Sequence, residues 1–98
     1  MEYIILKLPK GKSALLGKIL QDDSVSRQTI AVRDAISLGY KGDETYILIE
    51  GAVDALKKAE TIMGTEGESL QGEKKEDVRT KIKEAEDNVA EGLGFMFG

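Results

Sequence analysis

The sequence predicts an α+β fold, a two-layer sandwich of a small antiparallel sheet with helices on one face, plus a C-terminal helix. Three observations predict it. Apolar runs typical of strands occupy residues 2–8 and 45–50, with a less regular one at 28–34. Apolar residues at helical spacing follow the runs at 2–8 and 45–50. The resulting order, strand, helix, strand, strand, helix, is typical of a two-layer sandwich.

The first strand and helix are separated by a short turn. Residues 2–8 are mostly bulky and apolar, and Pro9 ends the run, so we predict a buried strand. Ser13 is the expected N-cap of the following helix. The apolar face of that helix carries Leu15, Leu16, Ile19 and Leu20.

The segment 25–39 fits two patterns. With period two, Ile30, Val32, Ile36 and Leu38 share one face of a strand. With helical period, Ser26 caps a helix that turns Ile30, Ala31, Ala35 and Leu38 inward. We favour a strand over 28–34, then a tight turn or short helix to Gly39. Asp34 interrupts the apolar alternation, and we place it at a strand end because an unpaired buried carboxylate is costly.

The run TYILIE at 45–50 is the clearest strand of the chain, and Gly51 gives its exit. The helix 52–63 that follows has an inward stripe of Val53, Leu56, Ala59, Ile62 and Met63. A ferredoxin-like arrangement would need a fourth strand, which only residues 68–70 could supply, and poorly.

Charge divides the chain into two parts, and the second is divided further by its composition. The domain, 1–63, carries 9 basic and 9 acidic residues, whereas 64–98 carry 5 basic and 9 acidic ones. Within the second part we expect a Gly-rich linker at 64–72, a charged helix at 73–91 and a Gly/Phe tail at 92–98. The helix has a thin apolar stripe of Val78, Ile82, Ala85 and Val89, too narrow to fold alone. The net charge of −4 disfavours nucleic-acid binding by bulk charge.

Composition excludes several classes of protein. The chain has no Cys and no His, so disulfides, thiolate nucleophiles, imidazole bases and the usual soft metal ligands are all missing. We therefore expect no enzyme, no cofactor and no metal site. No apolar run approaches the roughly 20 residues of a membrane span, and the N-terminus lacks signal-peptide features, so we expect a cytoplasmic protein without membrane contact. Abundant Lys and Glu with a single Asn indicates a thermophilic source.

The turn Lys10-Gly11-Lys12 resembles part of a phosphate-binding loop. A Walker A motif would need glycine at position 6, where this chain has Leu6, so that motif is excluded. A glycine turn at a helix N-terminus with Lys10 and Lys12 beside it still predicts an anion site on the Lys7–Lys18 surface. The alternative is an ordinary solvated turn.

Residues 47–59 resemble the second half of a KH domain: Ile47, Ile49 and Gly51 at alternate positions, then Leu56 and Ala59 on a helix. The resemblance implies a KH-like fold and nucleic-acid binding. KH domains hold the nucleic-acid backbone with a G-x-x-G loop. In this sequence Gly17-Lys18-Ile19-Leu20 lacks the second glycine.

The last residues contain both Phe residues of the chain. The segment 90–98, AEGLGFMFG after a Glu/Lys-rich run, resembles the C-terminal tail of archaeal ribosomal stalk proteins. The resemblance implies an archaeal source and a tail that binds a protein partner by laying side chains into a groove. The anchors would be Leu93, Phe95, Met96 and Phe97.

The sequence leaves the role of this tail open. It could bind a protein partner or a second copy of the chain, or it could dock onto the chain's own sheet. Membrane contact is disfavoured because no basic residues flank the tail. We predict a small non-enzymatic protein-binding module acting through the C-terminal helix and tail. The alternative is KH-like nucleic-acid or anion binding through the Lys7–Lys18 surface.

Overall fold

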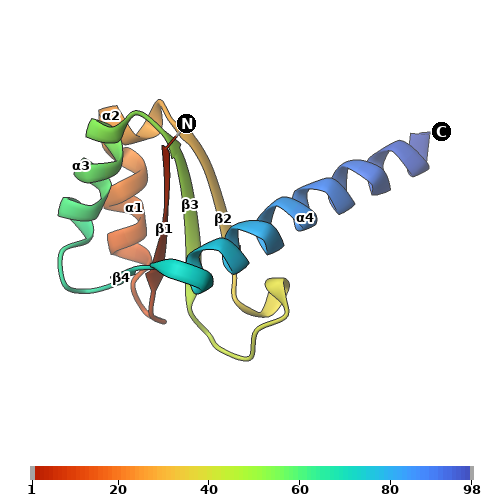
Figure 1. Ribbon diagram of the computed structural model, residues 1–98, viewed down its shortest axis with the longest axis horizontal. Helices are drawn as coiled ribbons and strands as arrows, with labels where there is room; N and C mark the ends of the chain where they lie inside the picture. The colour runs from red at the N-terminus through yellow and green to blue at the C-terminus, as the bar shows by residue number, and fades with distance from the viewer. Residues whose placement is uncertain (1, 98) are drawn as a thin grey trace.

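In the computed structural model, a four-stranded antiparallel sheet lies between two layers of helix (Figure 1). The structure describes the backbone of residues 2–97 and the side chains of residues 2–85. The predicted α+β fold with a small antiparallel sheet is confirmed. In chain order the elements are β1 (Glu2–Leu8), α1 (Ser13–Gln21), α2 (Asp23–Ser26), β2 (Thr29–Asp34), the 3-10 helix η1 (Ile36–Leu38), β3 (Thr45–Gly51), α3 (Val53–Met63), β4 (Glu68–Ser69) and α4 (Gly72–Phe97).

The sheet has the strand order β2-β3-β1-β4, with every neighbouring pair antiparallel. β1 and β3 form its centre, where Ile4 lies opposite Ile49 and Ile5 opposite Leu48. Successive side chains of a strand point to opposite faces, and both faces are covered in this protein. This is why residues 2–8 and 45–50 read as continuous apolar runs rather than as an alternation.

The fourth strand lies in the segment that the sequence marks as a linker, 64–72. β4 pairs with β1, and the following Leu70 is buried and donates its N–H to the carbonyl oxygen of Ile5 at 2.9 Å. Gly67 approaches β1 so closely that a β-carbon there would lie 2.8 Å from the carbonyl oxygen of Lys7. Within this segment, residues 68 and 69 therefore belong to the sheet. When α2, η1 and α4 are left aside, the elements follow one another in the order β-α-β-β-α-β.

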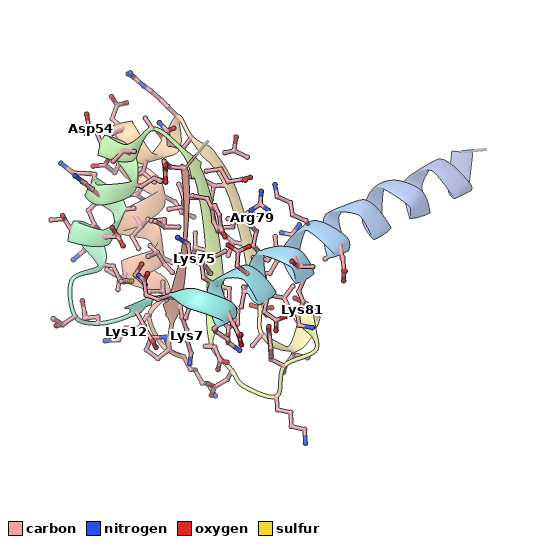
Figure 2. The ribbon with its side chains drawn as sticks, in the orientation of Figure 1. Lys7, Lys12, Asp54, Lys75, Arg79 and Lys81 are labelled. Atoms are coloured by element: carbon pink, nitrogen blue, oxygen red, sulfur yellow. The ribbon has the colours of Figure 1, made fainter. Side chains whose placement is uncertain are left out.

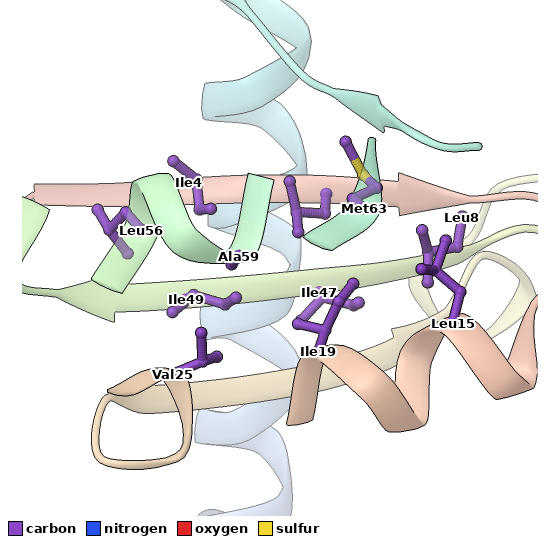
Figure 3. Packing of buried hydrophobic residues seen from close by; sticks show 11 residues of the cluster. Ile4, Leu8, Leu15, Ile19, Val25, Ile47, Ile49, Leu56, Ala59 and Met63 are labelled. Atoms are coloured by element: carbon purple, nitrogen blue, oxygen red, sulfur yellow. The ribbon is translucent and has the colours of Figure 1, made fainter. Parts of the chain in front are cut away.

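The helices α1, α2 and α3 cover one face of the sheet. Figure 3 shows α1 and α3 directing apolar side chains onto Ile47 and Ile49 of β3, both fully buried. Two details differ from the sequence prediction. α1 begins at Ser13 with Lys12 in the N-cap position and no side-chain cap. Val53 is 46% exposed, because it is the first residue of α3 and lies outside the buried stripe. The buried residues that the helices contribute to this layer are Leu15, Ile19, Val25, Leu56, Ala59 and Met63.

The ambiguous segment 25–39 forms a strand and a 3-10 turn, as favoured, with Gly39 at φ 90° closing the turn. The sequence does not predict the short helix α2, whose last two residues lie within this segment. Asp22, the C-cap of α1, also caps α2: its Oδ1 accepts the backbone N–H groups of Ser24 at 3.0 Å and Val25 at 3.1 Å. An Asp cap of this kind stabilises a helix start by about 1 kcal/mol.

The C-terminal helix α4 covers the other face of the sheet. The prediction that all helices lie on one face is therefore wrong. Val78 and Ile82 are fully buried there, against apolar residues of all three long strands. α4 spans Gly72–Phe97 and so includes both the expected helix 73–91 and most of the expected tail 92–98. The sheet residues in this second core are Ile5, Ala31, Tyr46 and Leu48.

Candidate functional site

The first half of α4 is anchored by the predicted apolar stripe. Val78 and Ile82 have no exposed surface, and Ala85, one step further along, is half-buried and packs against the same core. The spacing of these residues places them on one side of the helix. The next residue of the stripe, Val89, lies outside the described side chains. Burial of two aliphatic side chains stabilises the docked helix by roughly 3–6 kcal/mol before the entropy of ordering is subtracted.

A carboxylate on β3 adds a polar lock to this apolar contact. Glu50, with 13% of its side chain exposed, accepts a hydrogen bond from Lys83 Nζ at 2.6 Å and one from Arg79 Nη2 at 3.4 Å. The hydrogen bond from Lys83 lowers the pKa of Glu50 below its usual value, and the charge and hydrogen bond of Arg79 act in the same direction. Two cations one turn apart on α4 thus meet one carboxylate of the sheet.

The three tyrosines of the chain lie under the start of α4. The ring centroids of Tyr40 and Tyr46 are 5.7 Å apart, and Lys74 Nζ lies 3.8 Å from the Tyr40 centroid. Tyr3 has Lys75 Nζ at 4.6 Å and the guanidinium carbon of Arg79 at 4.8 Å from its centroid. Cations at such distances from an aromatic ring are attracted by about 0.5–1 kcal/mol each when exposed. Figure 2 labels Lys75 and Arg79 over the sheet.

The tyrosine hydroxyls also bind carboxylates. Tyr3 donates to Glu76, so it ties β1 to α4, and Tyr40, which lies between η1 and β3, donates to Asp77 of α4 at 3.3 Å. Burial, reinforced by a hydrogen bond to Glu44, raises the pKa of Tyr46 to about 12. No motif in the sequence marks these tyrosines as a group. Strand parity could have found two of them, because positions 3 and 46 share a face with the buried positions 5 and 48.

The predicted partner anchors lie at the far end of α4. The backbone of residues 92–97 is helical, where a Gly/Phe tail was expected. The side chains of the four anchors lie outside the described residues, so their contacts are not part of the structure. Figure 1 shows the second half of α4 extending away from the sheet. The anchors are Leu93, Phe95, Met96 and Phe97.

The predicted anion site at Lys10, Gly11 and Lys12 lies in the turn between β1 and α1. Gly11 has φ 87°, a left-handed conformation that favours glycine, and the turn borders a hollow of about 200 Å³. Lys12 Nζ forms an ion pair with Glu66 at 2.9 Å, and the hydrogen bond from Lys12 lowers the pKa of Glu66. Asp43 also lines the hollow. Glu66 and Asp43 thus offset part of the positive charge, although they lie 54 and 31 residues from Lys12 in the sequence.

The segment Gly17-Lys18-Ile19-Leu20, which lacks the second glycine of a G-x-x-G loop, is helical. Gly17 lies inside α1, where the backbone N–H groups belong to the helix rather than to a loop.

Asp34, the carboxylate that interrupts the apolar alternation, is the last residue of β2 and is exposed, as predicted. Among the described side chains, no group of three or more acidic residues is arranged to hold a metal ion.

Comparison with known proteins gives no relative. The sequence matches no protein family, and neither a curated protein nor a solved structure matches the chain. Within the described part of the chain, no helix is both long and apolar enough to cross a membrane.

Proposed function

We propose that this protein is a non-enzymatic protein-binding module whose binding element is the C-terminal half of α4, residues 86–97. The observation that carries the proposal is that α4 is longer than the sheet that supports it. A helix of 26 residues extends roughly 39 Å at about 1.5 Å per residue. Among the described side chains of α4, the last buried one is Ile82 and the last half-buried one is Ala85, and the ribbon beyond them leaves the domain (Figure 1).

The sequence of the extending half supports the same proposal. Val89, Leu93 and Met96 continue the helical spacing that begins at Val78, Ile82 and Ala85, in steps of four, three, four, four and three. An apolar stripe on a helix beyond its own domain suits recognition in a partner's hydrophobic groove. The resemblance of the last nine residues to archaeal ribosomal stalk tails adds a protein partner of the translation machinery as the class to test first.

Because the backbone of residues 92–97 is helical, the four predicted anchors do not all lie on the same side of the chain. On a helix, Leu93, Met96 and Phe97 lie at i, i+3 and i+4 and share one side, whereas Phe95 is two residues from Leu93 and lies on another side. We therefore expect Leu93, Met96 and Phe97 to contact the partner, and Phe95 to serve as a matched control.

The experiment is a quantitative pull-down with three forms of the full chain: wild type, Leu93→Ser with Phe97→Ser, and Phe95→Ser. A partner should be retained by the wild type and by Phe95→Ser and lost with the double variant. Titration of the purified partner should then show at least a tenfold loss of affinity, because two buried apolar anchors are removed. A wild-type chain and a double variant that retain the same proteins to the same extent would contradict the proposal.

A second candidate is anion binding at Lys10 and Lys12, which the hollow beside Gly11 favours. NMR titration with inorganic phosphate tests it. The shifts should centre on the N–H groups of residues 11–14, weaken steeply as salt rises, and vanish in Lys10→Ala with Lys12→Ala. Binding that survives both substitutions would exclude this site.

A further inference from the structure

The two edges of the sheet are built differently. On one side the sheet ends in β4, which is two residues long. On the other it ends in β2, which has six residues and pairs only with β3 among the described elements. The β2–β3 register runs from Thr29 to Asp34 without a bulge, and β2 contains no proline. A regular edge of this length presents a row of free backbone groups to which another strand can add.

The outward groups of β2 can be identified. In an antiparallel pair, alternate residues direct both backbone groups toward the partner strand. Ala35 donates its N–H to the carbonyl oxygen of Glu44 across that pair. The backbone N–H and C=O groups of the odd-numbered residues therefore point toward β3, and those of the even-numbered residues point outward. The carbonyl oxygen of Val32 accordingly points outward, where it accepts a hydrogen bond from Arg33 Nη1 at 2.7 Å.

We propose that a second copy of this chain adds its β2 antiparallel to β2 across a two-fold axis, so that the two sheets join into one of eight strands. The register that centres on Ala31 makes the edge self-complementary. It sets Ile30, which is half-buried, opposite the partner's Val32, and the reverse. On the other face it sets Arg33 opposite the partner's Thr29. Apolar residues meet apolar ones, and no like charges are opposed.

Two neighbouring registers also pair the outward backbone groups of β2, but their opposed side chains match less well. Setting Val32 opposite the partner's Val32 places Ile30 against the partner's Asp34. Setting Ile30 opposite the partner's Ile30 places Val32 against the partner's Gln28. Each of these buries an apolar side chain against a polar one. The sequence of the edge therefore selects both the occupant, a copy of itself, and one register.

The direction of α4 agrees with this arrangement. α4 crosses the sheet from the β4 side, contacts β1 and β3, and continues past β2 (Figures 1 and 3). A second copy at the β2 edge lies on the side toward which the end of α4 extends.

Arg33 controls access to the edge. Its guanidinium donates a hydrogen bond to the carbonyl oxygen of Val32. In the dimer this oxygen must accept a hydrogen bond from the backbone N–H of the partner's Ile30. The partner's N–H has to compete with this side chain for the oxygen, so the contact is reversible and Arg33 weakens it. Removing Arg33 should therefore strengthen the dimer, an effect that general damage to the fold would not produce.

Sedimentation equilibrium of the full-length chain over a concentration series tests the proposal. We expect a monomer–dimer equilibrium that tightens at least threefold in Arg33→Ala and weakens at least tenfold in Ile30→Lys, because a lysine ammonium would enter the strand interface. Ile62→Lys is the matched control. Ile62 is also half-buried against the same core but lies on α3, so this variant should dimerise like the wild type.

Hydrogen exchange distinguishes this contact from association through the end of α4. The Ile30 and Val32 amides should gain protection with rising protein concentration. Either of two results would overturn the proposal: a chain that stays monomeric at millimolar concentration even as Arg33→Ala, or a dimer that survives Ile30→Lys and is lost only when residues 92–98 are removed. The second result would leave the proposed function of α4 intact.

Discussion

Replacing Glu50 by Gln tests whether the carboxylate lock holds α4 on the sheet. The substitution keeps the size of the side chain and one carbonyl acceptor, but it removes the charge that Lys83 Nζ approaches at 2.6 Å and Arg79 Nη2 at 3.4 Å. Hydrogen bonds to charged groups contribute about 1.5–3 kcal/mol. Because both cations are 37% exposed, solvent screens part of this attraction, and we expect a loss of about 1–2 kcal/mol.

Urea unfolding of both forms measures this loss, and thermal unfolding should show a decrease of about 4–8 °C per kcal/mol. The pH dependence provides a second test. The pKa of Glu50 is lowered from 4.5 in the folded protein, so its contribution is present above pH 4.5 and disappears as pH falls through the lower folded value. Wild type and Glu50→Gln should therefore converge in stability at acidic pH.

Glu84→Gln is the matched control, since Glu84 lies on the exposed side of the same helix. Its unfolding free energy should stay within about 0.5 kcal/mol of the wild type. An equal loss in both variants would mean that net charge, and not the Glu50 contact, stabilises the protein. A Glu50→Gln protein as stable as the wild type at neutral pH would refute the lock.

Three further predictions concern the domain itself. Ile49→Ala removes a fully buried side chain from the central strand and should cost about 2–5 kcal/mol in urea unfolding; a loss below about 1 kcal/mol would mean that β3 is not central. Gly67→Ala should cost about 1–3 kcal/mol by overpacking, because its β-carbon would lie 2.8 Å from the Lys7 carbonyl oxygen; an unchanged stability would disprove the close approach of β4. Tyr46 has its pKa raised from 10.0 to about 12, so its neutral form stabilises the fold fully below pH 10 and this contribution is lost as pH rises toward 12; an ultraviolet titration in which all three tyrosines ionise together near pH 10 would contradict this.

The sequence was sufficient for the elements whose signal is local. β1, β3 and α3 follow from continuous apolar runs and helical spacing, and their observed bounds match the predicted ones within one residue. The strand in 28–34 follows from the period-two spacing of Ile30 and Val32. These features depend on neighbours within a few positions, which is what periodicity reports.

The features that the sequence did not predict depend on distant contacts. β4 has two residues, too few for any periodic signal, and it exists because Gly67 and Leu70 fit against β1. The position of α4 on the second face could not be read from its stripe, because a thin stripe fits a sheet, another chain or a coiled coil equally well. The pairing of Lys12 with Glu66 and of Glu50 with Lys83 joins residues far apart in the chain.

The proposed site was predicted in part. The apolar character of residues 93–97 is visible in the sequence, and so is the stripe that leads to them. The division of α4 into a docked half and an extending half is not, because it depends on where the sheet ends beneath the helix. That division is the basis for our proposal that the last residues bind a partner.

Removing residues 92–98 tests most directly whether the end of α4 serves a partner. Free energies of unfolding of the full and shortened chains should be compared by urea titration at neutral pH. If the end of α4 does serve a partner, the two values should agree within about 0.5 kcal/mol, as for a change at the protein surface. A loss of about 2 kcal/mol or more, the range of a buried-core truncation, would mean that these residues complete the chain's own core, and it would contradict the assignment of the helix end to a partner.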